Sequence, residues 1–325
     1  MSDIAVLQSQ VMIGAYEEIK TLSLKGIDTY MAPTKADVTG DTFNYDLFID
    51  QLEAEGLSSR GKPSSSFDME DAQNKSVKMP YVNKDFAIQG DNLANLRQAG
   101  SMAKDAAGRS YVMRKLNGIK RLEMRMREKL LWQMFTGTIT EKVDGIALNL
   151  SMGMSGSHTP TASPVWSLVG TKILDDVSDW LKLIEEDSGR VGALAWCNST
   201  VMKSMLKNTQ VLDLIGESSL TESAFRTGKI AEFAGLSWRV YNGKLADGSY
   251  IADDKLIITP EPDDWMAYAN GSVIILDDDG KEIEVTSPGA YSYTEKNPVG
   301  KIAVVKSCFL PVLTAKDSTI YATVQ

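Results

Sequence analysis

The first ninety residues carry two kinds of hydrophobic pattern and one long polar stretch. Apolar residues at helical spacing predict a helix over 4–28, which Gly26 is placed to end. They are Ile4, Leu7, Val11, Ala15 and Ile19. Alternating apolar and polar residues predict strands over 41–50 and 76–89. Roughly two dozen polar residues separate these strands, too many for a compact connection, and a two-stranded ribbon is marginal alone. We therefore expect an arm that is ordered by packing on another surface.

The strongest helical pattern lies over residues 101–135. Its apolar residues repeat at intervals of three and four and form one stripe. They are Val112, Leu116, Ile119, Met126, Leu130 and Met134. Gly137 is expected to end this helix. Trp132 and Phe135 lie on its apolar side, so we assign them to the core rather than to a cofactor platform.

The second half of the chain predicts a mixed α/β block and a β-rich end. The Gly/Ser/Pro-rich residues 151–164 predict a linker. Helices are predicted over 171–186, after a cap at Asn198 or Ser199, and near 221–234, with strands over 193–197, 236–243 and 254–260. Beyond them, "SVIILDDDGKEIEV" predicts a hairpin around Asp278, Asp279 and Gly280, and residues 300–324 predict two final strands.

Charge is segregated along the chain. The net charge is -9 and the pI near 4.9, which disfavours a sequence-specific nucleic-acid binder. Between Arg97 and Lys129, however, ten basic residues face three acidic ones, while from Asn242 to the end seven face thirteen. No aromatic residues interleave with the basic ones as stacking platforms. A solvated helix face, balanced by the rest of the fold, is the favoured interpretation over nucleic-acid contact.

The composition is that of an ordinary globular protein, with 43% hydrophobic and 24% charged residues. No apolar run reaches the length of a membrane helix, and the start lacks a signal-peptide pattern, so we expect a soluble protein without a membrane partner. Cys197 and Cys308 lie in apolar, strand-like stretches. We expect buried free thiols rather than a disulfide.

The stretch "EGLSSRGKPSSS", residues 55–66, is one residue short of a phosphate-binding loop. Gly56, Gly61 and Lys62 have the right spacing, but Pro63 stands where a Ser or Thr hydroxyl should meet the metal. Both flanks are polar, whereas a working loop joins a buried strand to a helix. A nucleotide site is therefore disfavoured, and no cofactor is expected.

Residues for catalysis or metal binding are scarce. His158 is the only histidine and lies in the predicted linker, where nothing rigid could orient it against a nucleophile. Asp277, Asp278 and Asp279 lack the alternation of a calcium loop, and an acidic turn is the favoured interpretation. Asp263 and Asp264 fit a helix start as well as general acid/base chemistry. We predict no enzyme activity and no metal site.

The order of these elements resembles the major capsid proteins of tailed bacteriophages with the Hong Kong 97 type of fold, in particular the lambda-like coat proteins. The resemblance rests on the ribbon, on the long helix ending "RLEMRMREKLLWQMFTG", on "GLSWRVYNGKLADGSYIADDKLIITPEP", and on "SCFLPVLTAKDSTIYATV" at the end. It implies an α+β fold with five parts. They are an N-terminal arm (1–40), an extended β-ribbon loop (41–89), a peripheral domain with the spine helix (90–165), an α/β axial domain (166–264) and the β part of the peripheral domain (265–325).

The resemblance also implies a function. The chain would self-assemble through pentamers and hexamers into the icosahedral head that encloses double-stranded DNA, which it would contact without sequence specificity. The arm would lie on neighbouring subunits, and Gly56, Arg60, Gly61, Lys62 and Pro63 would form the loop tip that settles on one of them. A scaffolding protein, a portal and a decoration protein are the further partners implied. Assembly would take place in the host cytoplasm, and the product would be the virion capsid.

Two alternatives stay open at this point. One is an encapsulin-like compartment of the same fold, which encloses cargo protein instead of a genome. The other, from a different class, is an α/β enzyme that uses a nucleotide, with Lys62 at the phosphates. Lys62 and Lys75 could take part in a covalent cross-link of the kind some family members form, but no acceptor is recognisable and none is predicted.

Overall fold

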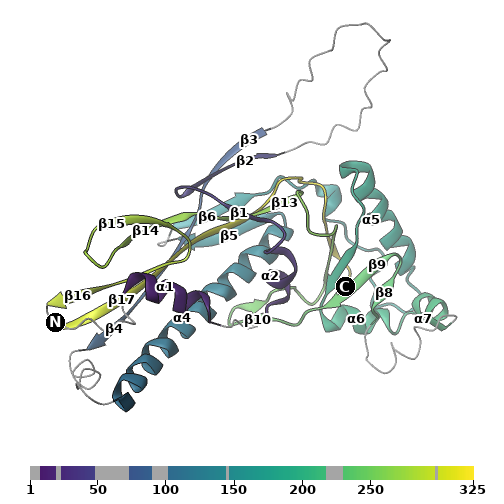
Figure 1. Cartoon of the computed structure of the whole chain (residues 1–325). Helices are drawn as coiled ribbons and strands as arrows, with labels where there is room; N and C mark the ends of the chain where they lie inside the picture. The colour runs from purple at the N-terminus through teal and green to yellow at the C-terminus, as the bar shows by residue number, and fades with distance from the viewer. Residues whose placement is uncertain are drawn as a thin grey trace, which may run out of the picture.

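The computed structural model in Figure 1 describes residues 8–19, 23–47, 73–89, 102–143, 146–216, 230–296 and 299–325. Helices and strands are interspersed along the chain, and the fold is α+β. The predicted loop tip, including Gly56, Arg60, Gly61, Lys62 and Pro63, lies outside the described residues.

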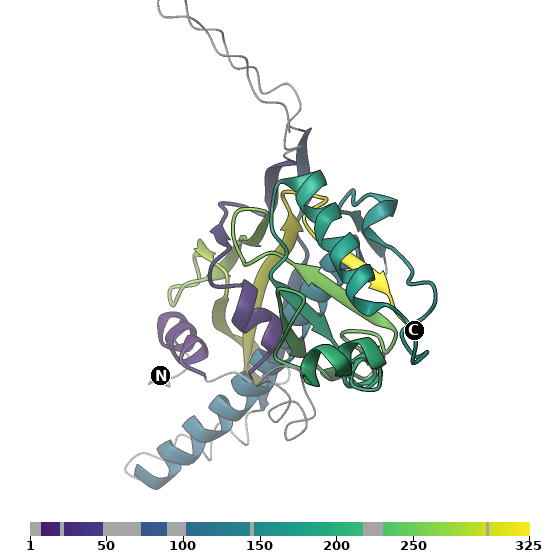
Figure 2. The same cartoon turned by 90° about the vertical axis from the view of Figure 1, so that its right-hand side faces the viewer.

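The long helix α4 (Met102–Phe135) confirms the helix predicted over 101–135. Val112, Leu116 and Leu130 on its apolar stripe are buried, whereas Met126 is half-buried. The buried side packs on β17 (Val299–Leu313), the longest strand. Figures 1 and 2 show the first half of α4 projecting beyond the sheets. Gly137, with a φ of +84°, follows the helix as predicted.

A mixed sheet is built around β17. Its neighbours are β16 (Gly289–Lys296), β13 (Met266–Asn270) and β4 (Tyr81–Gln89), all antiparallel to it. The short β1 (Lys35–Asp37) adds in parallel to β13. Two hairpins lie beside this sheet: β5 (Thr138–Val143) with β6 (Ile146–Ser151), and β14 (Ser272–Leu276) with β15 (Glu282–Thr286). The second hairpin is the one predicted around Asp278, Asp279 and Gly280.

The predicted ribbon is present but is interrupted. β2 (Thr42–Leu47) pairs with β3 (Gln73–Lys78), and residues 79–80 separate β3 from β4, so the single strand predicted over 76–89 is wrong. Met79 is 1% exposed and packs into the core at this break. Phe43 and Tyr45 stack at 5.4 Å and are buried as well. The base of the ribbon is therefore anchored in its own subunit.

The single helix predicted over 4–28 is wrong, because the described residues form α1 (Ser9–Glu17) and α2 (Lys25–Tyr30). Met12 and Tyr16 face the core, whereas Val11 is 44% exposed. Gly26, predicted to end the helix, lies inside α2 and is buried. Both helices pack on α4 of the same chain, so the described part of the predicted arm is not free to lie wholly on a neighbour.

The second block is a five-stranded sheet flanked by helices. Its order is β18 (Ile320–Thr323), β12 (Lys255–Thr259), β7 (Leu194–Cys197), β9 (Leu236–Val240) and β8 (Glu232–Phe233). Only the β7–β9 pair is parallel. A small hairpin of β10 (Lys244–Leu245) and β11 (Gly248–Ser249) precedes β12. Both predicted final strands exist, but the last, β18, joins this second sheet rather than the sheet of β17.

Three helices accompany the second sheet. α5 (Ile173–Ser188) and α6 (Ser199–Met205) confirm two predictions, and the Asn198 side chain caps α6 by accepting from Thr200 N and Val201 N. α7 (Thr209–Gly216) was not predicted. The helix predicted near 221–234 is wrong at residues 232–233, which form β8, and residues 217–229 lie outside the described residues.

An aromatic cluster joins the two blocks. Tyr30 of α2 lies 5.1 Å from the ring of Phe135 and 6.2 Å from those of Trp196 and Trp265. Trp132 lies 5.2 Å from Trp196. Trp132 and Phe135 are thus core residues, as predicted. Cys197 and Cys308 are buried free thiols, which also confirms the prediction.

Candidate assembly interface

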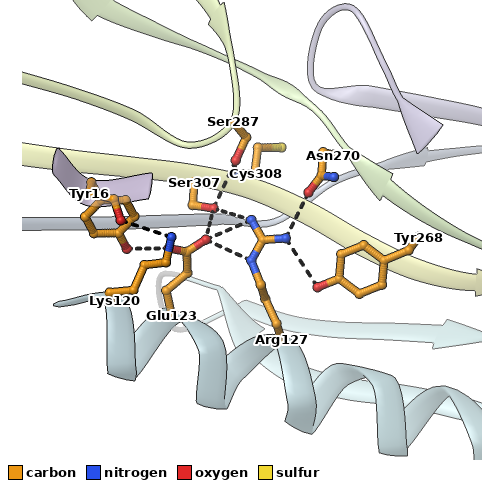
Figure 3. A network of polar contacts seen from close by, with 9 residues as sticks. All are labelled: Tyr16, Lys120, Glu123, Arg127, Tyr268, Asn270, Ser287, Ser307 and Cys308. Carbon is orange, nitrogen blue, oxygen red and sulfur yellow. Dashed lines mark hydrogen bonds and ion pairs between the residues drawn. The ribbon is translucent and has the colours of Figure 1, made fainter. Parts of the chain in front are cut away.

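A buried ion pair on α4 ties three parts of the chain together (Figure 3). Glu123 and Arg127 are 2% and 4% exposed, and both Nε and Nη2 of Arg127 lie 2.8 Å from Glu123 Oε1. Arg127 also donates to Asn270 Oδ1 at 2.8 Å and to Ser307 Oγ at 2.9 Å. Because every polar atom of the pair finds a partner, the helix is fixed in register against β13 and β17.

The same pair holds the N-terminal segment. The Tyr16 hydroxyl donates to Glu123 Oε2, and Lys120 Nζ donates to the Tyr16 carbonyl at 3.1 Å. Figure 3 shows the Tyr16 ring beside Lys120, whose ammonium lies 4.6 Å from the ring centroid. At the other end of α1, Asp278 of the β14–β15 turn accepts from Ser9 N at 2.8 Å. Helix α1 is therefore attached to its own subunit at both ends.

The electrostatics of this network favour the charged pair. Burial by itself raises the pKa of Glu123, but Arg127 and the hydrogen bonds from Ser307 and Tyr16 outweigh it and hold that pKa below its usual value. Burial and the Glu123 carboxylate raise the pKa of the Tyr16 phenol. Tyr16 is thus kept as a hydrogen-bond donor, and Glu123 as an acceptor. The arrangement is a structural joint, since both charged side chains are almost completely buried and their polar atoms are paired within the subunit.

A second buried carboxylate fixes α2. Glu128 is 0% exposed and accepts from Gly26 N at 3.0 Å, Ile27 N at 2.8 Å and Trp132 Nε1 at 2.8 Å. It thereby caps the first turn of α2 from another helix. A Cβ on Gly26 would lie 2.9 Å from both Glu128 Oε1 and Leu131 Cδ2, so the close approach of the two helices requires glycine here.

Helix α2 also reaches the second sheet. Tyr30 Oη lies 2.6 Å from Thr259 Oγ1 and accepts from Trp196 Nε1 at 2.8 Å. Lys25 Nζ donates to the Val240 carbonyl at 2.7 Å, and Arg239 donates to Thr29 Oγ1 at 2.9 Å. Residues 25–30 are therefore wedged between α4 and the second sheet.

The structure corrects the interpretation of His158. This residue ends the short 3₁₀ helix η2 (Gly156–His158) and is fully buried, so the segment is not a loose linker at this point. Its ring nitrogens lie 2.9 Å from the Thr319 carbonyl and 2.9 Å from Asp187 Oδ2. His158 thus joins residues 151–164 to α5 and to the turn before β18, which is a packing role.

The other candidate residues are dispersed. Asp264 pairs with Arg190 at 2.7 Å in a turn, and neither Asp263 nor Asp264 begins a helix. Asp277 Oδ1 accepts from Asp279 N and Lys281 N, which closes the hairpin turn as predicted. The described residues contain no group of three or more potential metal ligands. Among the same residues, no helix combines the length and apolarity needed to span a membrane.

The surface of α4 separates into two kinds of basic residue. Arg114, Arg121 and Arg125 are exposed, on the side of the helix opposite the apolar stripe. Arg127 is buried in its ion pair with Glu123, and Glu128 is buried separately against α2. Glu123 and Arg127 continue the spacing of Leu116 and Ile119, so position on the apolar stripe is the signal that could have revealed them.

Comparison with solved structures shows which fold the chain has. The chain matches a protein assigned as the capsid protein of a prophage of E. coli CFT073, with a TM-score of 0.60, 15% identity, and coverage of 98% of this chain and 99% of that one. It also matches a phage-related protein from Bordetella bronchiseptica RB50, with a TM-score of 0.57, 9% identity, and coverage of 97% and 96%. The fold is the Hong Kong 97 type, as the sequence resemblance implied.

The family follows from a second comparison. The family model described as phage major capsid protein E matches residues 9–324. The chain therefore belongs to this family, whose members form the phage head from many copies of one subunit. A comparison with curated protein sequences finds no match. Membership indicates a structural role in the virion and makes the encapsulin-like compartment a distant alternative.

Proposed function

We propose that this capsid subunit assembles through pentamers and hexamers into a closed icosahedral shell around double-stranded DNA. The observation that supports this most is the match to the capsid family over residues 9–324, on a body from which the paired strands β2 and β3 project. Because β2 and β3 pair only with each other among the described strands, the ribbon has no hydrophobic core of its own beyond its base. We infer that residues 48–72, which join the two strands, contact a neighbouring subunit in the shell.

The two blocks correspond to two positions in the shell. The sheet of β17 with α4 forms the peripheral domain, and the sheet of β12 with α5, α6 and α7 forms the axial domain at the centre of each capsomer. Because β18 pairs with β12, we count residues 320–325 with the axial domain and the remainder of 265–325 with the peripheral one. Residues 1–40 form an arm of which α1 and α2 are fixed to their own subunit.

Further partners follow from the same proposal. A separate scaffolding protein guides assembly in the host cytoplasm, and a portal and a decoration protein bind the shell. The packaged DNA is contacted without sequence specificity, because phosphate contacts by exposed lysines and arginines depend on salt rather than on sequence. The subunit acts as a structural protein and not as an enzyme.

The test is assembly of the purified subunit with its scaffolding protein. We expect closed particles in negative-stain images and a matching radius in light scattering. Monomers alone, over a range of salt and protein concentrations, would contradict the proposal. Nucleic acid inside particles isolated from infected cells separates a genome shell from a cargo compartment, and stabilisation by nucleotide and magnesium would support the nucleotide-using enzyme instead.

A further inference from the structure

The exposed face of α4 combines positive charge with an exposed leucine. Arg114, Arg121 and Arg125 follow one another at intervals of seven and four residues and so share one face, and Leu122, three residues before Arg125, lies at the edge of this face and is 55% exposed. In the described part of the chain, the side-chain ion pairs of α4 involve Arg127 and Lys129 rather than these three arginines. An exposed leucine gains from burial against apolar groups, which phosphates do not offer. The face therefore fits a protein partner better than DNA.

The β14–β15 hairpin carries a surface of the opposite charge. Ile274 is also 55% exposed and is paired across the strands with Glu284, while Leu276 is paired with Glu282. Residues two apart on a strand share a face, so these four side chains form one outer surface. Asp279 is exposed at its end. The hairpin thus presents apolar and acidic groups together, with Lys281 in the turn as the one basic residue between 272 and 286.

An open groove beside this surface has two carboxylates among mostly uncharged lining residues. It has a volume of about 250 Å³ and lies between residues 37–39 and the hairpin, with Asp37 and Glu284 on its walls. Glu284 accepts from Gly40 N at 3.2 Å and from the Ser272 hydroxyl, and so is held in place. Asp37 is paired with the exposed Lys35 at 3.1 Å. Such a groove suits the long, positively charged side chain of an arginine.

The two surfaces of one subunit do not meet. Figure 1 shows α4 and the β14–β15 hairpin on either side of strands β16 and β17. Each surface has an exposed apolar residue, and the charges around these residues are of opposite sign. A second copy of the chain can therefore supply the partner for each surface.

We propose that the exposed face of α4 docks on the outer face of the β14–β15 hairpin of a second copy, with Leu122 against Ile274. Arg121 and Arg125 then face Glu282, Asp279 and the groove beside Glu284. This inference rests on the proposed function, because a shell provides the neighbouring copy. It adds which two surfaces of the subunit meet.

A charge swap tests the contact. One variant carries Arg121→Glu and Arg125→Glu, a second carries Asp279→Arg and Glu282→Arg, and a third combines all four. Each half-swap should raise the subunit concentration needed for half-maximal assembly about tenfold, the effect of losing two exposed ion pairs. The combined variant restores opposite charges between copies and should return to within about threefold of the wild type. Lys182→Glu and Glu186→Lys on α5 form a matched control pair.

The outcomes separate this inference from the proposed function. If the wild type fails to assemble, the proposed function is wrong. If the wild type assembles and a half-swap assembles equally well, or the combined swap is no better than a half-swap, the docking contact is wrong. A swap on α4 that leaves assembly unchanged but releases packaged DNA would assign the face to DNA.

Site-specific cross-linking tests the apolar centre independently of charge. Both native cysteines are 0% exposed, so Leu122→Cys with Ile274→Cys places the reactive thiols on the surface. A short bismaleimide should link subunits of assembled particles into dimers and larger ladders. Leu122→Cys with Val191→Cys is the control, since Val191 is 70% exposed but lies outside both surfaces. Intact particles without links in the first pair, or equal links in both, would overturn the contact.

Discussion

Replacing Arg127 with methionine should cost the subunit about 3 to 5 kcal/mol of its free energy of unfolding. The substitution keeps a long apolar stem but removes every donor that Glu123, Asn270 and Ser307 receive from the guanidinium. Glu123 is 2% exposed, so its carboxylate would be left in the core with only Tyr16 and Ser307 as partners. The cost of this unpaired charge, rather than the net value of the ion pair, sets the magnitude.

The measurement is urea unfolding of the unassembled subunit at a fixed protein concentration, with tryptophan fluorescence as the signal. Arg121→Met on the exposed face of the same helix is the matched control and should change stability by no more than about 0.5 kcal/mol. A variant with both Glu123→Leu and Arg127→Met should lose less than the sum of the two single variants, by about 2 kcal/mol. A loss below about 1 kcal/mol for Arg127→Met, or additive losses, would refute this account of the joint.

Four further predictions follow from the packing of α2 and α4, the Glu123 carboxylate and the proposed loop, and the first two are tested by the same urea unfolding measurement. Gly26→Ala should destabilise the subunit by about 1 to 3 kcal/mol, because the added Cβ would meet Glu128 and Leu131. Gly14→Ala is the control and should stabilise the subunit by about 0.5 to 1 kcal/mol, because no atom lies within 4 Å of its added Cβ. Equal effects of the two substitutions would contradict the close packing of α2 on α4. Leu116→Ala should cost about 2 to 5 kcal/mol, and a cost near zero would place α4 outside the core. The pKa of Glu123 is depressed in the fold, so its contribution to stability is present above the unfolded value of about 4.3 and is lost as pH falls through the folded value. Glu123→Gln should therefore flatten the profile of thermal stability between pH 5 and 3 relative to the wild type, and an unchanged profile would contradict this role of the carboxylate. Deleting residues 55–72 should leave a folded subunit whose shells are unstable, and an unfolded subunit would show that the segment serves its own core.

Local pattern was sufficient for much of the fold. The apolar stripe of residues 101–135 is long enough that a helix is its only regular solution, and α4 follows it. The acidic turn around Asp278 and the cap at Asn198 also depend on neighbours within a few positions, and both are present. The family likewise follows from the order of such elements along the chain, which a family model can detect from sequence.

Contacts between distant segments decided the rest. Gly26 has the local character of a helix stop, but the approach of Glu128, about a hundred positions away, makes it the first turn of α2 instead. His158 lies in a stretch rich in glycine and serine, and only Asp187 and the Thr319 carbonyl turn it into a buried joint. Glu123 and Arg127 count as surface charge in any sum over the sequence, because pairing and burial are properties of the folded helix against β13 and β17. The sequence by itself therefore determined the long helix, the acidic turn, the helix cap and the family, whereas the tertiary structure decided how the N-terminal segment is divided into helices and which charges are buried in the subunit or left exposed.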